Sequence, residues 1–409
     1  MKLLKSLTTV TLLATFTVSL PTATIHAAAS INFKDIRGHW AERDVQIAVQ
    51  KGYVDGYVDE TFKPEQNVSR AEFIKMAVTA MSLKTLAALD KPWYEPFVES
   101  AVTNGIHRYE DYTSGDINTP ITREEMARIA VRSAGEKNTD DLKWMYLATS
   151  KGIINGLDNQ GTIGGEQPTT RAQAITVIER MLKLKAGEKL PSDKYATSAA
   201  EILWHKTNAS TMAPEYFGWA IENNIPFEFD KLRYEGAKGF SETEKYIVVD
   251  MADPTDPNRK LIPDTMRWIM AVGNERTATQ DVPTNAYAFL SFDHFYVESD
   301  TPLRGFFYSS LVLTNLFVTG NNIGKDGMLL DVTPYAESAG TGPVIKFGRI
   351  TLPAGTHDVR LVTGQLVPKM KGVDGNGFSV YKNPAQGLGE MTSNNIIYKS
   401  VINKSLGGK

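Results

Sequence analysis

The sequence of 409 residues contains no cysteine and only six histidines. Without cysteine the chain has no disulfide bonds, no thiolate-bound metals, no iron–sulfur clusters and no cysteine nucleophile. It also lacks an excess of positive charge, because 44 basic side chains face 47 acidic ones. A general nucleic-acid-binding role, which needs a basic surface, is therefore not expected. The length predicts two to three domains, so signals of function have to come from local patterns.

Long hydrophobic runs are missing outside the N-terminus. Lys2 and Lys5 precede an uncharged apolar stretch at 7–20, and small residues follow at 27–29. This order is typical of a secretory signal peptide, which we place at residues 1–29. A membrane anchor is the alternative, but the stretch is shorter than the roughly 20 apolar residues that span a bilayer. We expect an exported protein that has no membrane segment after signal cleavage.

Three imperfect repeats follow the predicted signal peptide. In each copy an apolar helical pattern ends at a glycine, and a loop leads to a Ser/Thr-Arg-x-Glu/Gln motif and a second helical pattern. The motif arginine comes 18, 18 and 19 residues after Gly52, Gly105 and Gly152, respectively. The first and last side chains of such a motif form a capping box, in which each accepts a hydrogen bond from a backbone N–H at the helix start. The predicted boxes pair Ser69 with Glu72, Thr122 with Glu125 and Thr170 with Gln173.

The motif arginines Arg70, Arg123 and Arg171 stand at the first helical position. The helix dipole makes a cation mildly unfavourable there, so three arginines at matching offsets indicate a shared task. A guanidinium beside free helix amides is suited to binding a carboxylate or phosphate. A salt bridge between adjacent repeats explains the same arginines equally well, and the residue pattern leaves both explanations open.

Residues 31–185 resemble three tandem S-layer homology (SLH) domains, which we assign to 30–88, 89–137 and 138–186. The third copy keeps part of the family pattern. The second is the most divergent and has Tyr109 where the other copies have Gly56 and Gly156. The first copy carries the pattern as Phe33-x-Asp35, Gly38-His39-Trp40-Ala41, Gly52-Tyr53-Val54-Asp55-Gly56, Thr61-Phe62-x-Pro64 and Ser69-Arg70-Ala71-Glu72.

This resemblance implies a fold and a function. Three SLH domains form an all-α, pseudo-threefold helical prism, and the grooves between them bind a pyruvylated secondary polysaccharide attached to peptidoglycan. The three motif arginines are then expected to contact the pyruvate carboxylate. Ser69, Thr122 and Thr170 are expected to cap the helices and face the ligand, while Asp35 and Trp40 line the first groove. Gly56 and Gly156 either let a sugar approach the backbone or simply form turns.

A polar segment at 187–195 reads as a linker to a C-terminal domain at 196–409. Helical patterns at 198–204 and 214–223 precede short strand patterns, which include 246–249, 286–290, 311–318 and 344–347. We therefore predict a mainly β domain, an antiparallel sandwich with a few helices.

The C-terminal half carries no recognisable catalytic motif. Asp293-His294 and His357-Asp358 are either two parts of one site or ordinary surface residues. Oxygen-rich stretches at 253–258 and 374–377 suit calcium but are also good turns, and no other cofactor is expected.

We expect a non-catalytic protein attached to the bacterial cell wall, whose C-terminal domain binds a surface-layer or carbohydrate partner or has a structural role. One alternative is a wall-anchored hydrolase of polysaccharides with its active site in residues 196–409. The other is an S-layer lattice subunit.

Overall fold

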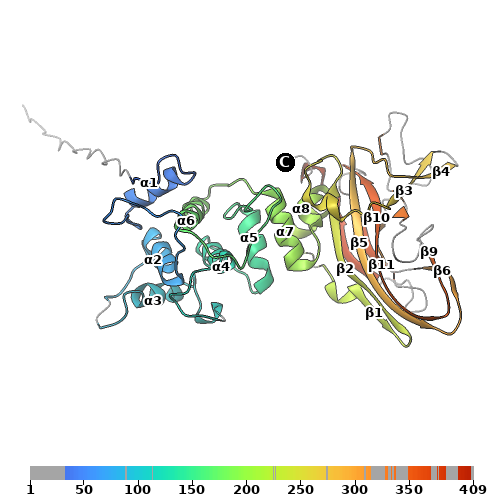
Figure 1. Ribbon diagram of the computed structural model, residues 1–409, viewed down its shortest axis with the longest axis horizontal. Helices are drawn as coiled ribbons and strands as arrows, with labels where there is room; N and C mark the ends of the chain where they lie inside the picture. The colour runs from blue at the N-terminus through green and yellow to red at the C-terminus, as the bar shows by residue number, and fades with distance from the viewer. Residues whose placement is uncertain are drawn as a thin grey trace, which may run out of the picture.

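The computed structural model describes residues 33–406 with internal gaps. The predicted signal peptide at 1–29 and the predicted strand at 344–347 lie outside the described residues. A helical N-terminal half is followed by a β-rich C-terminal half, as predicted (Figure 1). No helix in the described ranges is both long and apolar enough to cross a membrane. The gaps are 88–89, 113, 224, 226, 273–274, 308–309, 315–327, 330–332, 334–335, 338–348, 370–374, 376 and 384–394.

The helical half consists of three units, each with two helices joined by a loop. The first helix of each unit ends shortly before a glycine with a φ of 71° or 72°, a conformation that glycine adopts without strain. One apolar core runs through all three units, and Phe73, Met126 and Ile175 from the three second helices are fully buried in it. Unit one contains α1 (Glu42–Gln50) and α2 (Arg70–Ala80), unit two α3 (Glu95–Thr103), η1 (Tyr109–Asp111) and α4 (Arg123–Ser133), and unit three η2 (Asp141–Lys143), α5 (Trp144–Ser150) and α6 (Arg171–Lys185).

The N-termini of α2, α4 and α6 meet in a closed ring of backbone hydrogen bonds. Val68 N–H donates to Thr169 O (3.0 Å), Thr169 N–H to Ile121 O (2.9 Å) and Ile121 N–H to Val68 O (2.9 Å). The first two residues of each second helix follow the ring directly. Their amides donate to carbonyls in the loop of the next unit, and unit three donates to unit one. The sequence pattern predicts that these helix-start amides can bind an anion. In the structure they already donate to acceptors within the protein.

In its described residues, the C-terminal half contains three α-helices and several antiparallel sheets. The helices are α7 (Lys194–His205), α8 (Ala209–Met212) and α9 (Pro214–Glu222), so both predicted helices are present. The central sheet has the strand order β1-β2-β5-β10, formed by β1 (Arg233–Gly236), β2 (Gly239–Asp250), β5 (Ala286–Ser299) and β10 (Gly355–Pro368). Smaller sheets and turns are built from β3 (Arg267–Val272), β4 (Glu275–Thr279), β6 (Leu303–Phe307), β7 (Ser310–Thr314), β8 (Ala336–Glu337), β9 (Arg349–Leu352), β11 (Gly377–Asn383), β12 (Ile396–Val401), η3 (Phe229–Leu232), η4 (Pro257–Leu261) and η6 (Lys404–Leu406).

The central sheet is buried on both faces. Tyr246 and Val248 of β2 belong to a core shared with α8, α9, β11 and β12. Ile247 and Val249 belong to a second core that contains Trp268 of β3. A strand covered on both sides reads as a continuous apolar run rather than as alternation, which explains the pattern at 246–249.

The two halves of the chain are joined by packed helices. Helix α7 contacts α5 of unit three, and the two lie side by side between the helical units and the sheet (Figure 1). The indole N–H of Trp204 on α7 donates to Asp140 Oδ2 (2.7 Å), and its ring lies against that of Tyr146, with centroids 4.9 Å apart. The predicted linker at 187–195 therefore connects two halves that pack against each other.

Unit two has an additional polar network around the buried Asp111. Its carboxylate accepts hydrogen bonds from Arg108 N–H (2.8 Å) and Arg132 Nη2 (2.9 Å), and His107 Nδ1 lies 3.2 Å from it. Burial alone would raise the pKa of Asp111, but the contacts with His107, Arg132 and the Arg108 amide lower it well below its usual range. The ionised carboxylate therefore fixes the loop of unit two to α4.

We predict that Asp111→Asn lowers the melting temperature of the protein at neutral pH. We also expect the melting temperature of the variant to fall less than that of the wild type as the pH is lowered. A carboxylate whose pKa is lowered by folding stabilises the protein above its unfolded pKa of 3.8, and this contribution is lost as the pH falls towards the folded pKa. The difference in melting temperature between wild type and variant should be largest at pH 5–7 and should shrink towards about pH 2. Thermal scans across this range measure it, and a difference that stays constant would contradict the assignment.

Candidate functional site

Each motif arginine reaches into the loop of the following unit and donates to backbone carbonyls there. Arg123 donates to Asn155 O (2.8 Å) and Ile163 O (2.9 Å) in unit three. Arg171 and Arg70 act likewise on units one and two, with acceptors at Asp55 O (2.9 Å) and Phe62 O (3.0 Å), and at Ser114 O (2.7 Å) and Asp116 O (3.1 Å), respectively. All three arginines are buried. They are therefore contacts between repeats, although two of them hold carbonyls rather than a carboxylate.

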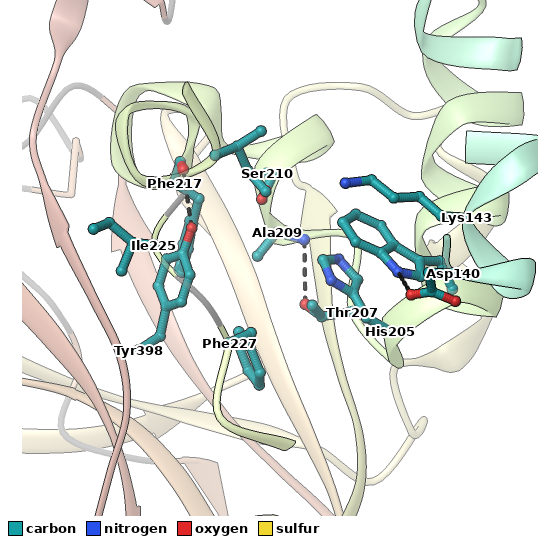
Figure 2. A pocket seen from close by; sticks show the side chains of 12 residues that line it. Asp140, Lys143, His205, Thr207, Ala209, Ser210, Phe217, Ile225, Phe227 and Tyr398 are labelled. Carbon is teal, nitrogen blue, oxygen red and sulfur yellow. Dashed lines mark hydrogen bonds between the residues drawn. The ribbon is translucent and has the colours of Figure 1, made fainter. Parts of the chain in front are cut away.

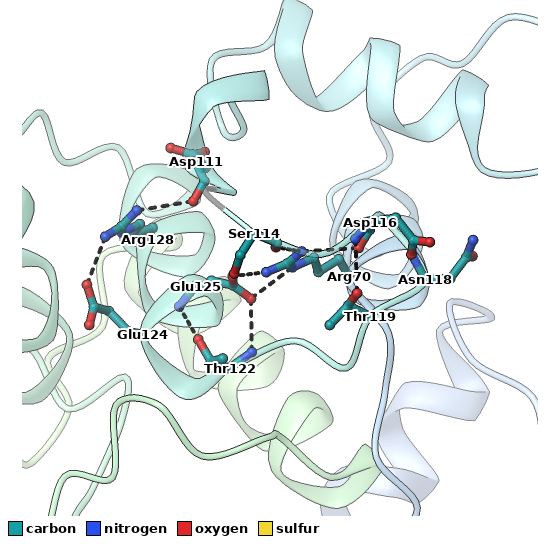
Figure 3. A network of polar contacts seen from close by, with 10 residues as sticks. All are labelled: Arg70, Asp111, Ser114, Asp116, Asn118, Thr119, Thr122, Glu124, Glu125 and Arg128. Atoms are coloured by element: carbon teal, nitrogen blue, oxygen red, sulfur yellow. Dashed lines mark hydrogen bonds and ion pairs between the residues drawn. The ribbon is translucent and has the colours of Figure 1, made fainter.

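Arg70 is the exception, because it also forms an ion pair. Its guanidinium binds the Glu125 carboxylate through Nε (3.1 Å) and Nη2. Glu125 simultaneously accepts from Thr122 N–H (3.0 Å) as part of the capping box of α4 (Figure 3). Corresponding boxes form at α2 and α6. The hydroxyls of Ser69, Thr122 and Thr170 thus accept from amides of their own helices.

The first groove, as we name it, is a cavity of about 360 Å³ to which all three units contribute. Unit one supplies its loop at 52–57 and one face of α2, unit two supplies Trp93, and unit three supplies Arg171. Within the described ranges no carboxylate forms an ion pair with Arg171 or with Lys75, which stands on α2. Trp93 is 49% exposed, and Lys75 Nζ lies 5.8 Å from the centre of its ring. An aromatic surface beside cations that have no carboxylate partner in the described ranges can receive an acidic sugar.

The sequence-predicted residues of this groove are only partly brought together. Gly56 and Arg171 both line it. Asp35 instead accepts hydrogen bonds from Phe62 N–H and Lys63 N–H, each at 2.8 Å, and so caps the loop of its own unit. Trp40 is 62% exposed but is not among the lining residues. Asp35 and Trp40 therefore do not line this cavity, and Trp93 supplies its indole. A role of Asp35 and Trp40 in ligand binding stays a prediction.

Packing also explains why position 56, which lines the groove, is a glycine. A Cβ built on it would lie 2.0 Å from the ring of Phe33, so no other residue fits without moving that ring. Trp93 could not be assigned from the first repeat because it belongs to unit two, and Lys75 lies within α2 outside any motif. The equal spacing of Trp40 and Trp93 before their glycines was the available signal.

The loops of units two and three differ from that of unit one. The loop of unit two lines a cavity of about 300 Å³ together with Glu95 and Val98 of α3. In unit two, Tyr109 replaces the glycine, and Asp111 ties the loop to Arg128 and Arg132 of α4. In unit three, the loop is covered by the segment 190–196, and Gly156 N–H donates to Asp193 Oδ2 (3.0 Å).

A second cavity of about 280 Å³ lies at the junction of the two halves. Figure 2 shows Asp140 and Lys143 on one side and Phe217, Ile225, Phe227 and Tyr398 on the other. Trp204 lines it, but its ring is stacked on His205 at 4.0 Å, and Lys143 Nζ lies 4.3 Å from its centre. These contacts engage Trp204 in joining the two halves.

The candidate residues of the C-terminal half are separated by the pleat of β5. His294 Nε2 lies 2.6 Å from Asp358 Oδ1, in an outer cluster with Glu244 and Arg360. Asp293 faces the opposite side, where it is buried beside Lys382. Burial raises the pKa of Asp293 to about 6 and lowers that of Lys382 to about 8. The two predicted pairs therefore do not form one site, although His294 and Asp358 do meet.

The possible calcium ligands are engaged in turns where the structure describes them. Asp253 accepts from Thr255 N–H (2.8 Å), and Asp256 accepts from Asn258 N–H (2.8 Å) and Asp250 N–H (2.7 Å). No group of three or more potential metal-ligating side chains occurs in the described part of the chain. Residues 374 and 376 of the stretch at 374–377 lie outside it.

We predict that Arg70→Met destabilises the protein by about 3–5 kcal/mol, because it leaves Glu125 buried without its partner. The side chains of Arg70 and Glu125 are only 4% and 13% exposed. The double variant Arg70→Met/Glu125→Gln should lose less than the sum of the two single variants. Denaturant unfolding measures these losses. Removing the exposed Lys91–Glu99 pair by Lys91→Met is the control and should change little; a similar loss at both sites would contradict the buried role.

Comparisons with known proteins support the resemblance of the first unit to an S-layer homology domain. A model of the S-layer homology domain matches residues 32–74. The exoglucanase XynX of Acetivibrio thermocellus is 29% identical over 180 residues, which are 38% of this chain and 16% of that protein. The surface-layer 125 kDa protein of Lysinibacillus sphaericus is 27% identical over 182 residues, or 39% of this chain and 15% of that protein.

A cellulosome-anchoring protein of Acetivibrio thermocellus is 49% identical over 43 residues, which are 10% of each chain. The matched regions thus span less than a fifth of the length of these relatives. The family match includes the first capping box and its arginine. Residues 32–74 of this chain form an S-layer homology domain.

Proposed function

We propose that the helical half attaches the protein non-covalently to the bacterial cell wall and that the first groove binds the wall polymer. The observation that carries this proposal is the groove itself, in which Arg171 and Lys75 have no carboxylate partner in the described structure and Trp93 is half exposed. The SLH domain and the relatives named as a surface-layer and an anchoring protein support a location at the cell surface. The predicted signal peptide at 1–29 supplies the export.

Units two and three are proposed to be divergent SLH domains, so that the three form a pseudo-threefold prism. The closed hydrogen-bond ring at Val68, Ile121 and Thr169 supports this, because each unit makes the same contact with the next. The lengths of two alignments, 180 and 182 residues, also exceed the 43 residues of a single matched SLH domain.

The proposed ligand is a secondary cell-wall polysaccharide that carries pyruvate ketals. A ketal places a carboxylate next to a sugar ring, and the first groove offers a matching pair of surfaces. The cations of Arg171 and Lys75 attract the carboxylate, while the indole of Trp93 packs against an apolar face of the sugar. Glu72 and Asp55 at the edge of the groove can accept hydrogen bonds from sugar hydroxyls.

The C-terminal domain is proposed to have a binding or structural role at the surface. A wall-anchored hydrolase is the second candidate, which the exoglucanase among the relatives favours. Against it, the charged groups of the C-terminal half described above contact one another, a threonine hydroxyl or backbone amides. We therefore keep attachment as the main proposal.

Wall binding tests the proposal with a pair of tryptophan variants. The mature chain is sedimented with walls whose secondary polysaccharide carries pyruvate ketals. Trp93→Ala and Lys75→Ala should each weaken binding about tenfold, the effect of losing a contact of about 1.4 kcal/mol. Trp40→Ala is the matched control, since this indole is also exposed but lies outside the first groove, and it should bind like the wild type.

Chemical removal of the ketals from the same walls tests the proposed ligand separately from the proposed binding site. Binding of the wild type should fall to that of Trp93→Ala or below. Retention on ketal-free walls would rule out the carboxylate as the recognised group. Equal losses for Trp93→Ala and Trp40→Ala would show that the first groove is not the binding site.

A further inference from the structure

The loop of unit three is covered by the chain's own segment at 190–196, which leads into α7. A Cβ on Gly152 would lie 2.4 Å from Pro191 O, and a Cβ on Gly161 would lie 2.3 Å from the backbone of Tyr195. Two glycines are thus required because this segment packs directly on the loop. The loop of unit one, which lines the first groove, has no such cover among the described residues.

Asp193 is the centre of this contact. Its Oδ2 accepts from Gly156 N–H (3.0 Å), and its Oδ1 accepts from Tyr195 N–H and Ala196 N–H, both at 3.1 Å, as the N-cap of α7. Gly156 corresponds to Gly56 of the first groove. A carboxylate is therefore bound to the loop of unit three at the residue equivalent to Gly56. The loop of unit three thus binds a carboxylate of the chain itself through one backbone amide.

The rest of the first groove has counterparts around this loop. Arg123 holds Asn155 O as Arg171 holds Asp55 O, one residue before the glycine in each case. Units one and three adjoin, because Asp44 of α1 accepts from the Thr176 hydroxyl of α6 (2.9 Å). Trp40 precedes α1 as Trp93 precedes α3, and it is 62% exposed without an assigned role.

We propose that the loop of unit three, with Arg123 and Trp40, is a second acid-binding groove, which the chain occupies with its own Asp193 carboxylate. The proposal rests on the proposed function of the first groove, because it assigns the same class of ligand, an acidic sugar, to both. Segment 190–196 is then an internal competitor of the wall polymer. As long as it is seated, the loop of unit three is not available to the ligand.

The test counts binding sites on the mature chain by titration calorimetry with a pyruvate-ketal monosaccharide glycoside. Asp193→Ser removes the carboxylate, but serine still caps α7. A second variant adds Pro191→Gly and Ser192→Gly to loosen the cover. We expect one site in the wild type and two sites in at least one of these variants. Adding Trp40→Ala to that variant should weaken the newly opened site about tenfold, and adding Trp93→Ala should weaken the first groove and leave the newly opened site unchanged.

The outcomes separate the two proposals. One site in the wild type and in both variants would overturn the internal competitor while leaving the first groove intact. Absence of binding to the wild type would overturn the proposed function and this inference with it. Retained binding at the first groove in the variants that keep Trp93 is the control for correct folding.

Discussion

The closed ring of hydrogen bonds among Val68, Ile121 and Thr169 is the constraint on which the helical half depends. It brings three helix N-termini together, and the amides that follow the ring donate to the loop of the next unit. A cation at the first helical position would be unfavourable in isolation. Here the guanidinium extends away from the helix and binds carbonyls of the neighbouring loop. The arginine therefore serves the contact between units, and each loop is held in shape by a residue from another repeat.

Because the loops are fixed in this way, small substitutions decide what each one can receive. Unit one has Gly56 in its loop and Lys75 on its helix, which leaves an open space beside Trp93. Unit two has Tyr109 at the corresponding place, and the ionised Asp111 ties its loop to α4. Unit three keeps the glycine but lies beneath another segment of the chain. Three units joined by the same ring of hydrogen bonds thus present three different surfaces.

The sequence predicts the features that are local and misses those that combine repeats. A capping box spans four residues, so Ser69 and its equivalents could be assigned from spacing alone. The first groove takes its indole from unit two and its arginine from unit three, and no linear pattern within one repeat contains both. The same reason explains Asp35, whose family position suggested a ligand contact but whose carboxylate caps its own loop. In β5, alternation places Asp293 and His294 on opposite faces, so adjacency in sequence implied a proximity that the sheet prevents.

The segment at 187–195 shows how attachment and display are linked in one chain. Its polar composition predicts a linker, and a flexible linker would let the two halves move independently. Instead Asp193 bonds to the loop of unit three while it caps α7, and Trp204 on the same helix bonds to Asp140 of unit three. The orientation of the C-terminal domain is therefore set by contacts at both ends of one helix. A ligand that displaced Asp193 would remove one of these contacts, so that occupancy of the third loop and the mobility of the C-terminal domain would be thermodynamically coupled.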